Sequence, residues 1–320
     1  MASAELILEI CPEPQAWDTL VAASPQGTVF SERRFLLALE CRFRLWQVRQ
    51  GHKIVALLAA IESAQGEDLV QFPFTPYQGL MFLHEAHSLF RQRVLDEFRI
   101  AEFVVQELCQ HYRNISMSLS WLLQDVRPFL WHHYHQPELG QFSMTPRYTA
   151  LLDLQAVSFD EIKMQARACR RQELKKTAQY EVRFDANVGD FMHLYAQTFA
   201  RQEIVLDQDS LDLVERIVRA ALAGGYGKLS SCAGERGIAS MNLFVYDNKR
   251  AYYLFAANDP QLRNTGAATR LMFENIFAAK TMGLAELDFV GVNSPNRGDF
   301  KLSFNPDLKL YFDVHLRQTG

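Results

Sequence analysis

Runs of apolar residues separated by short polar stretches predict a sheet and one long helix in the first half of the chain. The runs 45–50 and 53–61 flank a Gly-His pair, which is the spacing of a β-hairpin. A further strand is expected at 69–74, where the sequence reads LVQFPF. A helix then follows from about residue 85 to 112, and ISMSLSW predicts a strand at 115–121. The predicted order is three strands, a helix and a strand.

The second half of the chain repeats this order. The runs 227–233 and 238–246 flank the turn GERG, and the apolar run 251–257 follows the turn DNKR. A helix is predicted over 266–282 and a strand over 285–292, after Gly283. Two halves with one order of elements and no obvious sequence identity indicate an internal duplication.

This repeat predicts two domains of one architecture. A chain of 320 residues has room for two domains of about 150 residues each. We place the boundary near Thr145, which gives domains 1–145 and 146–320, with the alternative that the last strand returns to the first domain. The expected fold class is α/β (α+β), with a mixed, mostly antiparallel sheet flanked by helices in each domain.

Composition excludes several classes of protein. The net charge is -4 and the pI is about 6.2, so a contact with nucleic acid or lipid must come from a local basic patch. The N-terminus has no basic stretch followed by an apolar one, and no run approaches about 18 apolar residues, so we expect a cytoplasmic protein. Five widely spaced cysteines without a C-x-x-C pair predict reduced core thiols rather than disulfides or a zinc site.

A helix is predicted to begin after Ser158 and to run to about residue 180. Ser158 and Glu161 have the spacing of a capping box. Ile162, Ala166 and Cys169 fall at i, i+4 and i+7, so we expect them to form a buried stripe.

The same helix carries basic residues on another face. They are Lys163, Arg167, Arg170 and Arg171, followed by Lys175 and Lys176. In an acidic protein such a face would attract a polyanion, such as a diphosphate or an RNA backbone. The alternative is a solvated face whose cations favour the C-terminal end of a helix.

The stretch RNTGAATR at 263–270 follows a strand and opens an amphipathic helix. A helix that starts at Gly266 would direct backbone N–H groups and the positive end of its dipole at an anion. The alternative is a simple helix start capped by Asn264 or Thr265. In the helix itself, the residues expected to face inward are Leu271, Met272, Ile276 and Phe277.

Several motifs together resemble a known family. The pattern R-x-x-G-x-A is similar to the pyrophosphate loop of GNAT acetyltransferases. The stretch D-F-V-G at 288–291, a polar loop and F-K-x-x-F at 300–304 resemble the end of the FemAB-like branch of the GNAT superfamily. The likeness extends through YAQTFARQ and TPRYTALLDL to FPFTPYQGL in the first half. It implies two GNAT-like domains in tandem.

The resemblance implies an N-acyltransferase that transfers an acyl or aminoacyl group to an amine by direct attack. The donor would be acyl-CoA or aminoacyl-tRNA, with no tightly bound cofactor. The best-known relatives use aminoacyl-tRNA and act on a peptidoglycan precursor; a polysaccharide amine, a protein lysine and a small metabolite are further candidate acceptors. The alternatives are an inactive GNAT-fold scaffold protein of cell-envelope or polysaccharide biosynthesis, and an unrelated α/β enzyme.

The chain also departs from the family pattern, which leaves the donor open. It has no coiled-coil arm and no basic tail for tRNA, and Ala268 stands where the conventional coenzyme A loop has a second glycine.

The resemblance also implies roles for particular residues. Lys301 would stabilise the oxyanion of a tetrahedral intermediate, for which a positioned cation is worth several kcal/mol. Asp288 would orient the amine or cap its loop, and no Ser or Cys has the setting of a covalent nucleophile. The cluster WHHYHQPE lacks metal-ligand spacing, so we expect no metal. The candidate residues are Lys301, Asp288 and Phe300 for catalysis, Arg263, Asn264, Thr265, Gly266, Ala267 and Ala268 for the donor, and Arg170, Arg171, Tyr77 and Phe304 for the substrate.

Overall fold

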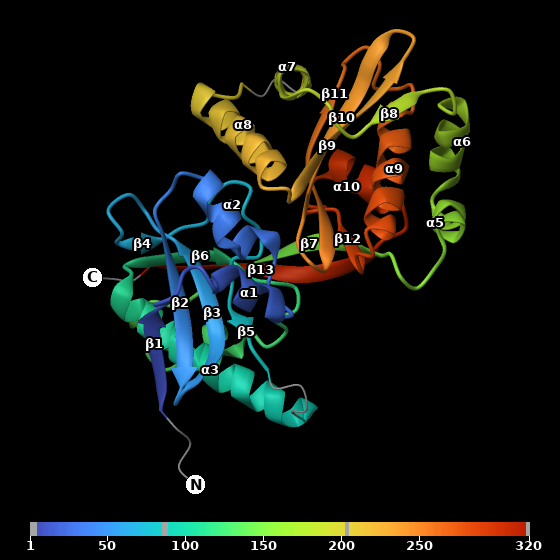
Figure 1. The fold of residues 1–320 in the computed structure, drawn as a ribbon. Helices are drawn as coiled ribbons and strands as arrows, with labels where there is room; N and C mark the ends of the chain where they lie inside the picture. The colour runs from blue at the N-terminus through green and yellow to red at the C-terminus, as the bar shows by residue number, and fades with distance from the viewer. Residues whose placement is uncertain (1–4, 85–88, 202–204, 318–320) are drawn as a thin grey trace. The chain divides into compact units, whose positions relative to one another are not determined.

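The computed structural model describes residues 5–84, 89–201 and 205–317 and divides into two compact units (Figure 1). Unit 1 consists of Met1–Arg147 and Leu310–Gly320, and unit 2 of Tyr148–Lys309. The division falls after Arg147, and the last strand, Asp307–Arg317, belongs to unit 1 from Leu310 onward.

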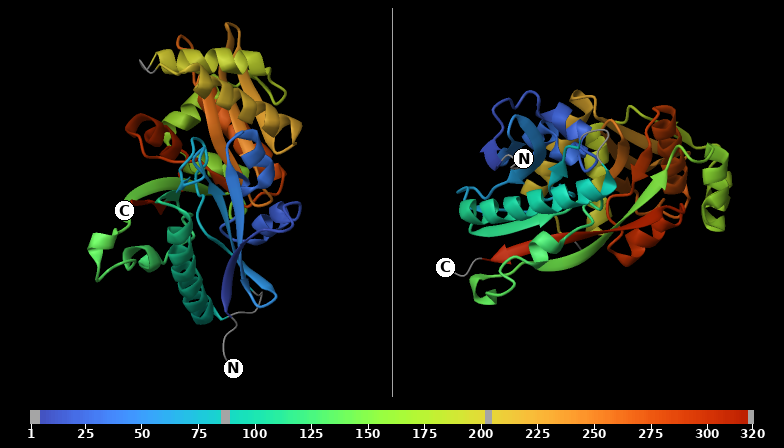
Figure 2. Two further views of the ribbon diagram at one scale, coloured as in Figure 1. Left: turned by 90° about the vertical axis from the view of Figure 1, so that its left-hand side faces the viewer. Right: turned by 90° about the horizontal axis from the view of Figure 1, so that it is seen from below.

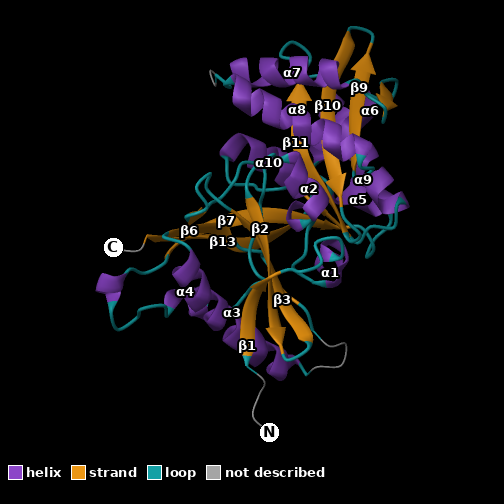
Figure 3. Cartoon of the chain, turned by 60° about the vertical axis from the view of Figure 1, so that its left-hand side comes forward, coloured by secondary structure: helices purple, strands orange, loops and turns teal. Residues whose placement is uncertain are grey.

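Unit 1 contains an antiparallel sheet in the order β1-β2-β3-β5. Its central pair is the predicted hairpin, in which the tight turn places Gly51 at φ 63°, a conformation that favours glycine. Figure 3 shows β1, β2 and β3 side by side. The strands are β1 (Leu6–Ile10), β2 (Phe43–Gln50), β3 (Lys53–Ile61) and β5 (Met81–Phe82).

A second group of strands has the order β4-β6-β13-β7, in which β7 up to Arg147 and β13 from Leu310 belong to unit 1. The strand predicted at 69–74 is wrong beyond its first residue, since β4 ends at Leu69. Pro73 and Pro76 lack the N–H that a ladder needs, and Phe74 lies at a positive φ. The strands are β4 (Asp68–Leu69), β6 (Asn114–Ser118), β7 (Ser143–Asp153) and β13 (Asp307–Arg317).

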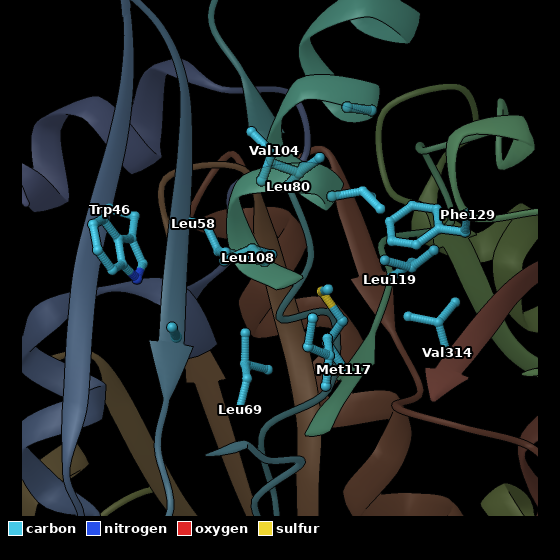
Figure 4. Packing of buried hydrophobic residues seen from close by; sticks show 14 of the residues in the cluster. Trp46, Leu58, Leu69, Leu80, Val104, Leu108, Met117, Leu119, Phe129 and Val314 are labelled. Atoms are coloured by element: carbon cyan, nitrogen blue, oxygen red, sulfur yellow. The ribbon is translucent and has the colours of Figure 1, made fainter. Parts of the chain in front are cut away.

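The long helix of unit 1 is α3, Phe90–His111, and Figure 2 shows it from two further sides. It confirms the predicted helix over this range, whereas residues 85–88 lie outside the described residues. Its apolar face packs into the main core of the unit, a cluster that includes Val104 and Leu108 of the helix and Met117 of β6 (Figure 4). The shorter helices are α1 (Trp17–Ala23), α2 (Arg33–Ala38), α4 (Arg127–Leu130) and the 3-10 turns η1 (Val29–Ser31) and η2 (Pro137–Leu139).

Unit 2 contains a mixed sheet in the order β7-β12-β11-β10-β9-β8, mostly antiparallel. The predicted hairpin and the strand after it are confirmed as β9, β10 and β11. The strand predicted over 285–292 is shorter, because the chain leaves the ladder after Asp288. The remaining strands are β8 (Glu181–Arg183), β9 (Gly227–Gly234), β10 (Gly237–Tyr246), β11 (Arg250–Asn258) and β12 (Glu286–Asp288).

The two parallel strands of this sheet part soon after they meet. β11 pairs with β12 only where Arg250–Tyr252 face Glu286–Asp288, and β11 then continues to Asn258 without β12 beside it. This divergence leaves room for the loop after β12 and for the helix that follows it.

Helices cover both faces of the sheet in unit 2. Figure 1 shows α9 on one side of β9 and β10 and α8 on the other, and both helices pack on β9. The helices are α5 (Phe159–Gln165), α6 (Ala168–Lys176), α7 (Val188–Ala200), α8 (Gln208–Ala223), α9 (Ala267–Thr281) and α10 (Pro295–Leu302).

The single helix predicted from Ser158 to about residue 180 is wrong. The capping box of Ser158 and Glu161 is present, but α5 ends before Ala166 and α6 begins after Arg167. The chain is extended at this break because the Arg167 N–H donates to the Ser303 carbonyl at 2.9 Å instead of to the helix. The predicted basic face is therefore divided between two helices.

The break also changes which side chains are buried. Ile162 and Ala166 are buried as expected, but Cys169 on α6 is exposed. Of the other thiols, Cys11 and Cys232 are buried, and burial raises the pKa of Cys232 to about 12. Within the described part of the chain, no helix is both long and apolar enough to cross a membrane.

Candidate functional site

The loop after β12 is built around the carboxylate of Asp288. This side chain is fully buried and accepts hydrogen bonds from the Thr149 hydroxyl at 2.5 Å and from the Val290 N–H at 2.7 Å. Val290 and Gly291 both have positive φ, 50° and 76°, so the backbone reverses here. A β-branched residue rarely adopts that conformation, and surrounding bonds must hold it.

Lys301 of α10 extends toward this reversed backbone. Its ammonium donates to the carbonyls of Gly291 at 2.8 Å and Val290 at 3.1 Å, and it lies over the ring of Tyr253 at 5.6 Å from the centroid. Burial lowers the pKa of Lys301 to about 8, although the charge of Asp288 acts in the opposite direction. Lys301 can therefore give up its proton near pH 8.

The two phenylalanines of the F-K-x-x-F motif lie in different surroundings. Phe304 is fully buried and contacts the rings of Phe273 and Phe289, so it belongs to the core. Phe300 is only partly buried, and the Arg170 guanidinium lies over its ring at 5.1 Å.

Two residues near Lys301 were not identified as candidates from the sequence: Tyr253 of β11, whose ring lies under the ammonium, and Arg297 of α10, whose charge acts on it. Tyr195 and Phe199 of α7 lie near Arg297. The Arg297 guanidinium lies 5.3 Å from the Phe199 centroid. Burial raises the pKa of Tyr195 to about 12, against the charge of Arg297. The sequence signal that could have identified Arg297 is its place in the polar loop before the F-K-x-x-F motif.

The stretch 263–270 forms the loop and first turn of α9. Gly266 is the N-cap with φ 91°, so the N-cap residue is neither Asn264 nor Thr265. The Thr265 hydroxyl still accepts a long bond of 3.4 Å from the Ala267 N–H, the first of the helix, and donates to the Leu262 carbonyl at 2.7 Å. Arg263 and Asn264 are exposed, whereas Ala268 is half-buried.

Helix α6 packs on this loop at Gly266. A Cβ built at Gly266 would lie 2.8 Å from the Cβ of Glu173, which explains why glycine stands here. Glu173 accepts hydrogen bonds from the Thr269 hydroxyl and, at 2.7 Å, from Arg170. The start of α9 therefore already faces one carboxylate from the protein itself.

The remaining candidates are held by local contacts. Arg170 donates to Thr269 at 2.8 Å, and Arg171 donates to the carbonyls of Met164 and Ala166 at the end of α5. In α9, the expectation that Phe277 faces inward is wrong, because 48% of it is exposed; Leu271, Met272 and Ile276 are buried.

Tyr77 belongs to unit 1, whereas the other candidates belong to unit 2. Its side chain is buried, with a φ of 65°, and its ring contacts Trp121 at 4.6 Å and Tyr311 at 5.3 Å. It lies in an aromatic cluster of the core of that unit. Among the described residues, no three His, Cys, Asp or Glu side chains gather as metal ligands would.

Part of the chain matches a known family model. Residues 163–302 match the family model of the acetyltransferase (GNAT) domain. No curated protein sequence matches the chain. The range 163–302 includes α6, the loop before α9, the loop after β12 and Lys301.

Solved structures match over the full length of the chain. The structure of FemX is 12% identical with a TM-score of 0.66, and the match covers 96% of each chain. A tandem GNAT protein from the clavulanic acid biosynthesis pathway is 9% identical with a TM-score of 0.56 over 99% of each chain. L-PGS from Bacillus licheniformis is 12% identical with a TM-score of 0.52, over 96% of this chain and 92% of that one.

The chain thus resembles FemX and the tandem GNAT protein in fold, and its second unit carries the matched GNAT domain. The predicted fold class is confirmed, and the predicted resemblance is confirmed as a likeness of fold, with the GNAT family model matching residues 163–302.

Proposed function

We propose that the protein is an N-acyltransferase that transfers an acyl or aminoacyl group from acyl-CoA or aminoacyl-tRNA to an amine. The proposal rests on how the Lys301 ammonium is held. Within the matched GNAT domain, two backbone carbonyls hold its ammonium, and a third N–H remains for a substrate oxygen.

In the proposed reaction, the nitrogen of a neutral amine attacks the donor carbonyl carbon. The carbonyl oxygen becomes an oxyanion that accepts a hydrogen bond from Lys301, an interaction worth several kcal/mol in the transition state. The C–S bond of a thioester or the C–O bond of an ester then breaks, the amine loses a proton and the leaving group gains one. Burial raises the pKa values of Cys109 and Cys232 to about 11 and 12, which supports direct attack without an acyl-cysteine.

The donor phosphates would lie at the loop 263–268, beside the positive end of the α9 dipole. Arg263 and Asn264 are exposed there and able to contact phosphate oxygens, while Gly266 and Ala268 would offer backbone N–H groups. The N–H of Thr265 donates to the Leu262 carbonyl at 3.0 Å and that of Ala267 to the Thr265 hydroxyl at 3.4 Å, so these two residues would shape the loop. Arg170 and Arg171 would face a phosphate of donor or acceptor, and Phe300 would contact the transferred group. Both donors are made in the cytoplasm, where we propose that the protein acts.

The acceptor class follows from the family alone. A peptidoglycan precursor, a polysaccharide amine, a protein lysine and a small metabolite all present the required amine. We propose no tightly bound cofactor, since both donors act as substrates.

The test is acyl transfer from radiolabelled acetyl-CoA, longer acyl-CoAs and aminoacyl-tRNA to a panel of such amines. We expect one donor to be consumed, and Lys301→Ala to lower kcat at least about 100-fold, the scale for loss of an oxyanion donor. Lys309→Ala, which removes an ion-paired lysine of β13, is the matched control and should keep full activity. Equal activity of wild type and Lys301→Ala would contradict the proposal and favour a scaffold protein.

A further inference from the structure

We propose that Thr149 and Asp288 are positioning residues for Lys301: they hold the turn at Val290–Gly291 whose two carbonyls receive the lysine ammonium. This inference rests on the proposed function and concerns the same site. It assigns a part in the reaction to a threonine on β7, a strand that holds none of the other candidate residues.

The turn needs support because its backbone is strained. Val290 has φ 50°, and a β-branched side chain is crowded in the left-handed region. Glycine tolerates the conformation at the next position, where φ is 76°. Such a backbone persists only where its surroundings over-determine it.

Thr149 supplies that support together with Asp288. The Thr149 hydroxyl donates to Asp288 Oδ1 at 2.5 Å and accepts from the Gly291 N–H at 3.1 Å. The Val290 N–H donates to the same carboxylate oxygen at 2.7 Å. Thr149 and Asp288 are fully buried, so water does not replace these bonds if the hydroxyl is lost.

The N–H groups of the turn point to Asp288 and Thr149, and its carbonyls point to Lys301. The ammonium donates to the Gly291 carbonyl at 2.8 Å and to the Val290 carbonyl at 3.1 Å. Two of its three N–H groups are thereby fixed, which fixes the direction of the third. Displacing the turn would therefore misdirect the group that meets the oxyanion.

The position of Asp288 also decides between its two predicted roles. A fully buried carboxylate that already accepts from Thr149 and Val290 is placed to cap the loop rather than to orient an incoming amine. Its charge still acts on Lys301, because it opposes the lowering of the lysine pKa by burial. The other groups that face Lys301 are Arg297, whose charge lowers that pKa, and the ring of Tyr253.

The experiment compares Thr149→Val, which keeps the shape and removes the hydroxyl, with Thr149→Ser, which keeps the hydroxyl. The first readout is the titration of Lys301 by NMR of protein labelled with ¹³Cε lysine, with the signal assigned by its loss in Lys301→Ala. The second is kcat and KM for the donor that the wild type consumes. Ser230→Ala is the matched control, because Ser230 is another buried hydroxyl of unit 2 that accepts from Asn275, away from Lys301.

We expect Thr149→Val to shift the Lys301 titration by at least half a pH unit and to lower kcat at least tenfold, with KM within twofold of wild type. Thr149→Ser should restore both, and Ser230→Ala should change neither. An unaltered Lys301 titration in Thr149→Val overturns the inference, as does a Thr149→Ser variant that behaves like Thr149→Val.

Asp288→Asn provides a second test if Thr149→Val does not fold. The amide oxygen still accepts from Thr149 and Val290, but the charge is gone, so the Lys301 titration should move to lower pH. An unchanged titration overturns the inference. The NMR readout does not require turnover, so absence of acyl transfer with every donor would reject the proposed function while leaving this inference testable on its own.

Discussion

The carboxylate of Glu173 accepts a hydrogen bond from the hydroxyl of Thr269 at 2.5 Å, in the first turn of α9. The protein thus places one of its own negative charges at the end of the helix where donor phosphates would bind. Helix α6, which carries Glu173, buries no residue fully and is held by polar contacts of this kind. A phosphate bound at the start of α9 and the Glu173 carboxylate would repel each other.

We predict that Glu173→Gln tightens the binding of coenzyme A. The glutamine amide keeps an oxygen that accepts from Thr269 or Arg170, but it carries no charge to repel the phosphates of coenzyme A. A charge at a helix terminus changes the free energy by about 1 kcal/mol. That corresponds to a roughly fivefold lower Kd. Calorimetric titration of wild type and variant with coenzyme A, at fixed low ionic strength, measures it.

Glu215→Gln is the control for this titration, since Glu215 forms an i,i+4 ion pair with Arg219 on α8, outside the proposed donor loop. Its Kd should equal that of wild type. Weaker binding by Glu173→Gln than by wild type would mean that the carboxylate organises the site instead of competing for it.

A second prediction concerns the close contact of α6 with the start of α9. Gly266→Ala should destabilise the protein by about 1–3 kcal/mol, because a side chain at positive φ is strained. The new Cβ would in addition lie 2.8 Å from the Cβ of Glu173. Urea unfolding gives the free energy, and amide hydrogen exchange over 168–176 should rise as α6 is pushed away.

Gly283→Ala is a matched control for that variant. Gly283 has a similar φ of 78°, but nothing lies within 4 Å of a Cβ built there. Its loss of stability measures the backbone strain alone, and the excess in Gly266→Ala measures the contact with α6. If the two variants lose equal stability, α6 does not resist the added methyl group.

Local signals were enough to predict much of the fold. The hairpins at 45–61 and 227–246 were predicted because alternation and a central turn are properties of short segments. The break between α5 and α6 was not, because the Ser303 carbonyl that takes the Arg167 N–H lies far along the chain. The predicted helix failed where a tertiary hydrogen bond replaced a local one.

The candidate site shows the same limit. Lys301 was singled out because its motif is contiguous, whereas Tyr253 contacts it from β11 and Thr149, on β7, bonds to Asp288 and to the Gly291 N–H of the turn that receives it. Nothing in the stretch around Thr149 distinguishes its hydroxyl from that of an ordinary strand threonine. Likewise, the motif made Phe304 a candidate for the substrate, but its burial against Phe289 depends on how the chain after α10 packs.

A third prediction follows from the lowered pKa of Lys301. If the ammonium form stabilises the oxyanion, kcat should fall about tenfold per pH unit above pH 8, where Lys301 loses its proton. Lys301→Arg should have a lower kcat, since a guanidinium does not fit the two carbonyls as an ammonium does, but no such fall up to pH 10. The measurement is kcat against pH at saturating donor and acceptor; the same fall in both proteins would assign it to another group.

A fourth prediction applies the same pKa to stability. In the folded protein Lys301 has a pKa of about 8, below its ordinary value of 10.5, which the unfolded chain regains. Between these two values the unfolded state binds a proton that the folded state does not, so the free energy of unfolding rises with pH, by at most about 1.4 kcal/mol per unit from this group. Below pH 8 the folded state carries the cost of burying the charge.

Lys301→Met removes that group, so the stability of wild type relative to the variant should increase steadily from pH 8 to pH 10 and stay constant from pH 6 to pH 7. Urea unfolding of both proteins at each pH gives the difference, in which the other titrating groups cancel. If this stability difference decreases above pH 8, the folded state retains the Lys301 proton. The carbonyls of Val290 and Gly291 and the charge of Asp288 would then stabilise the ammonium by more than its desolvation costs.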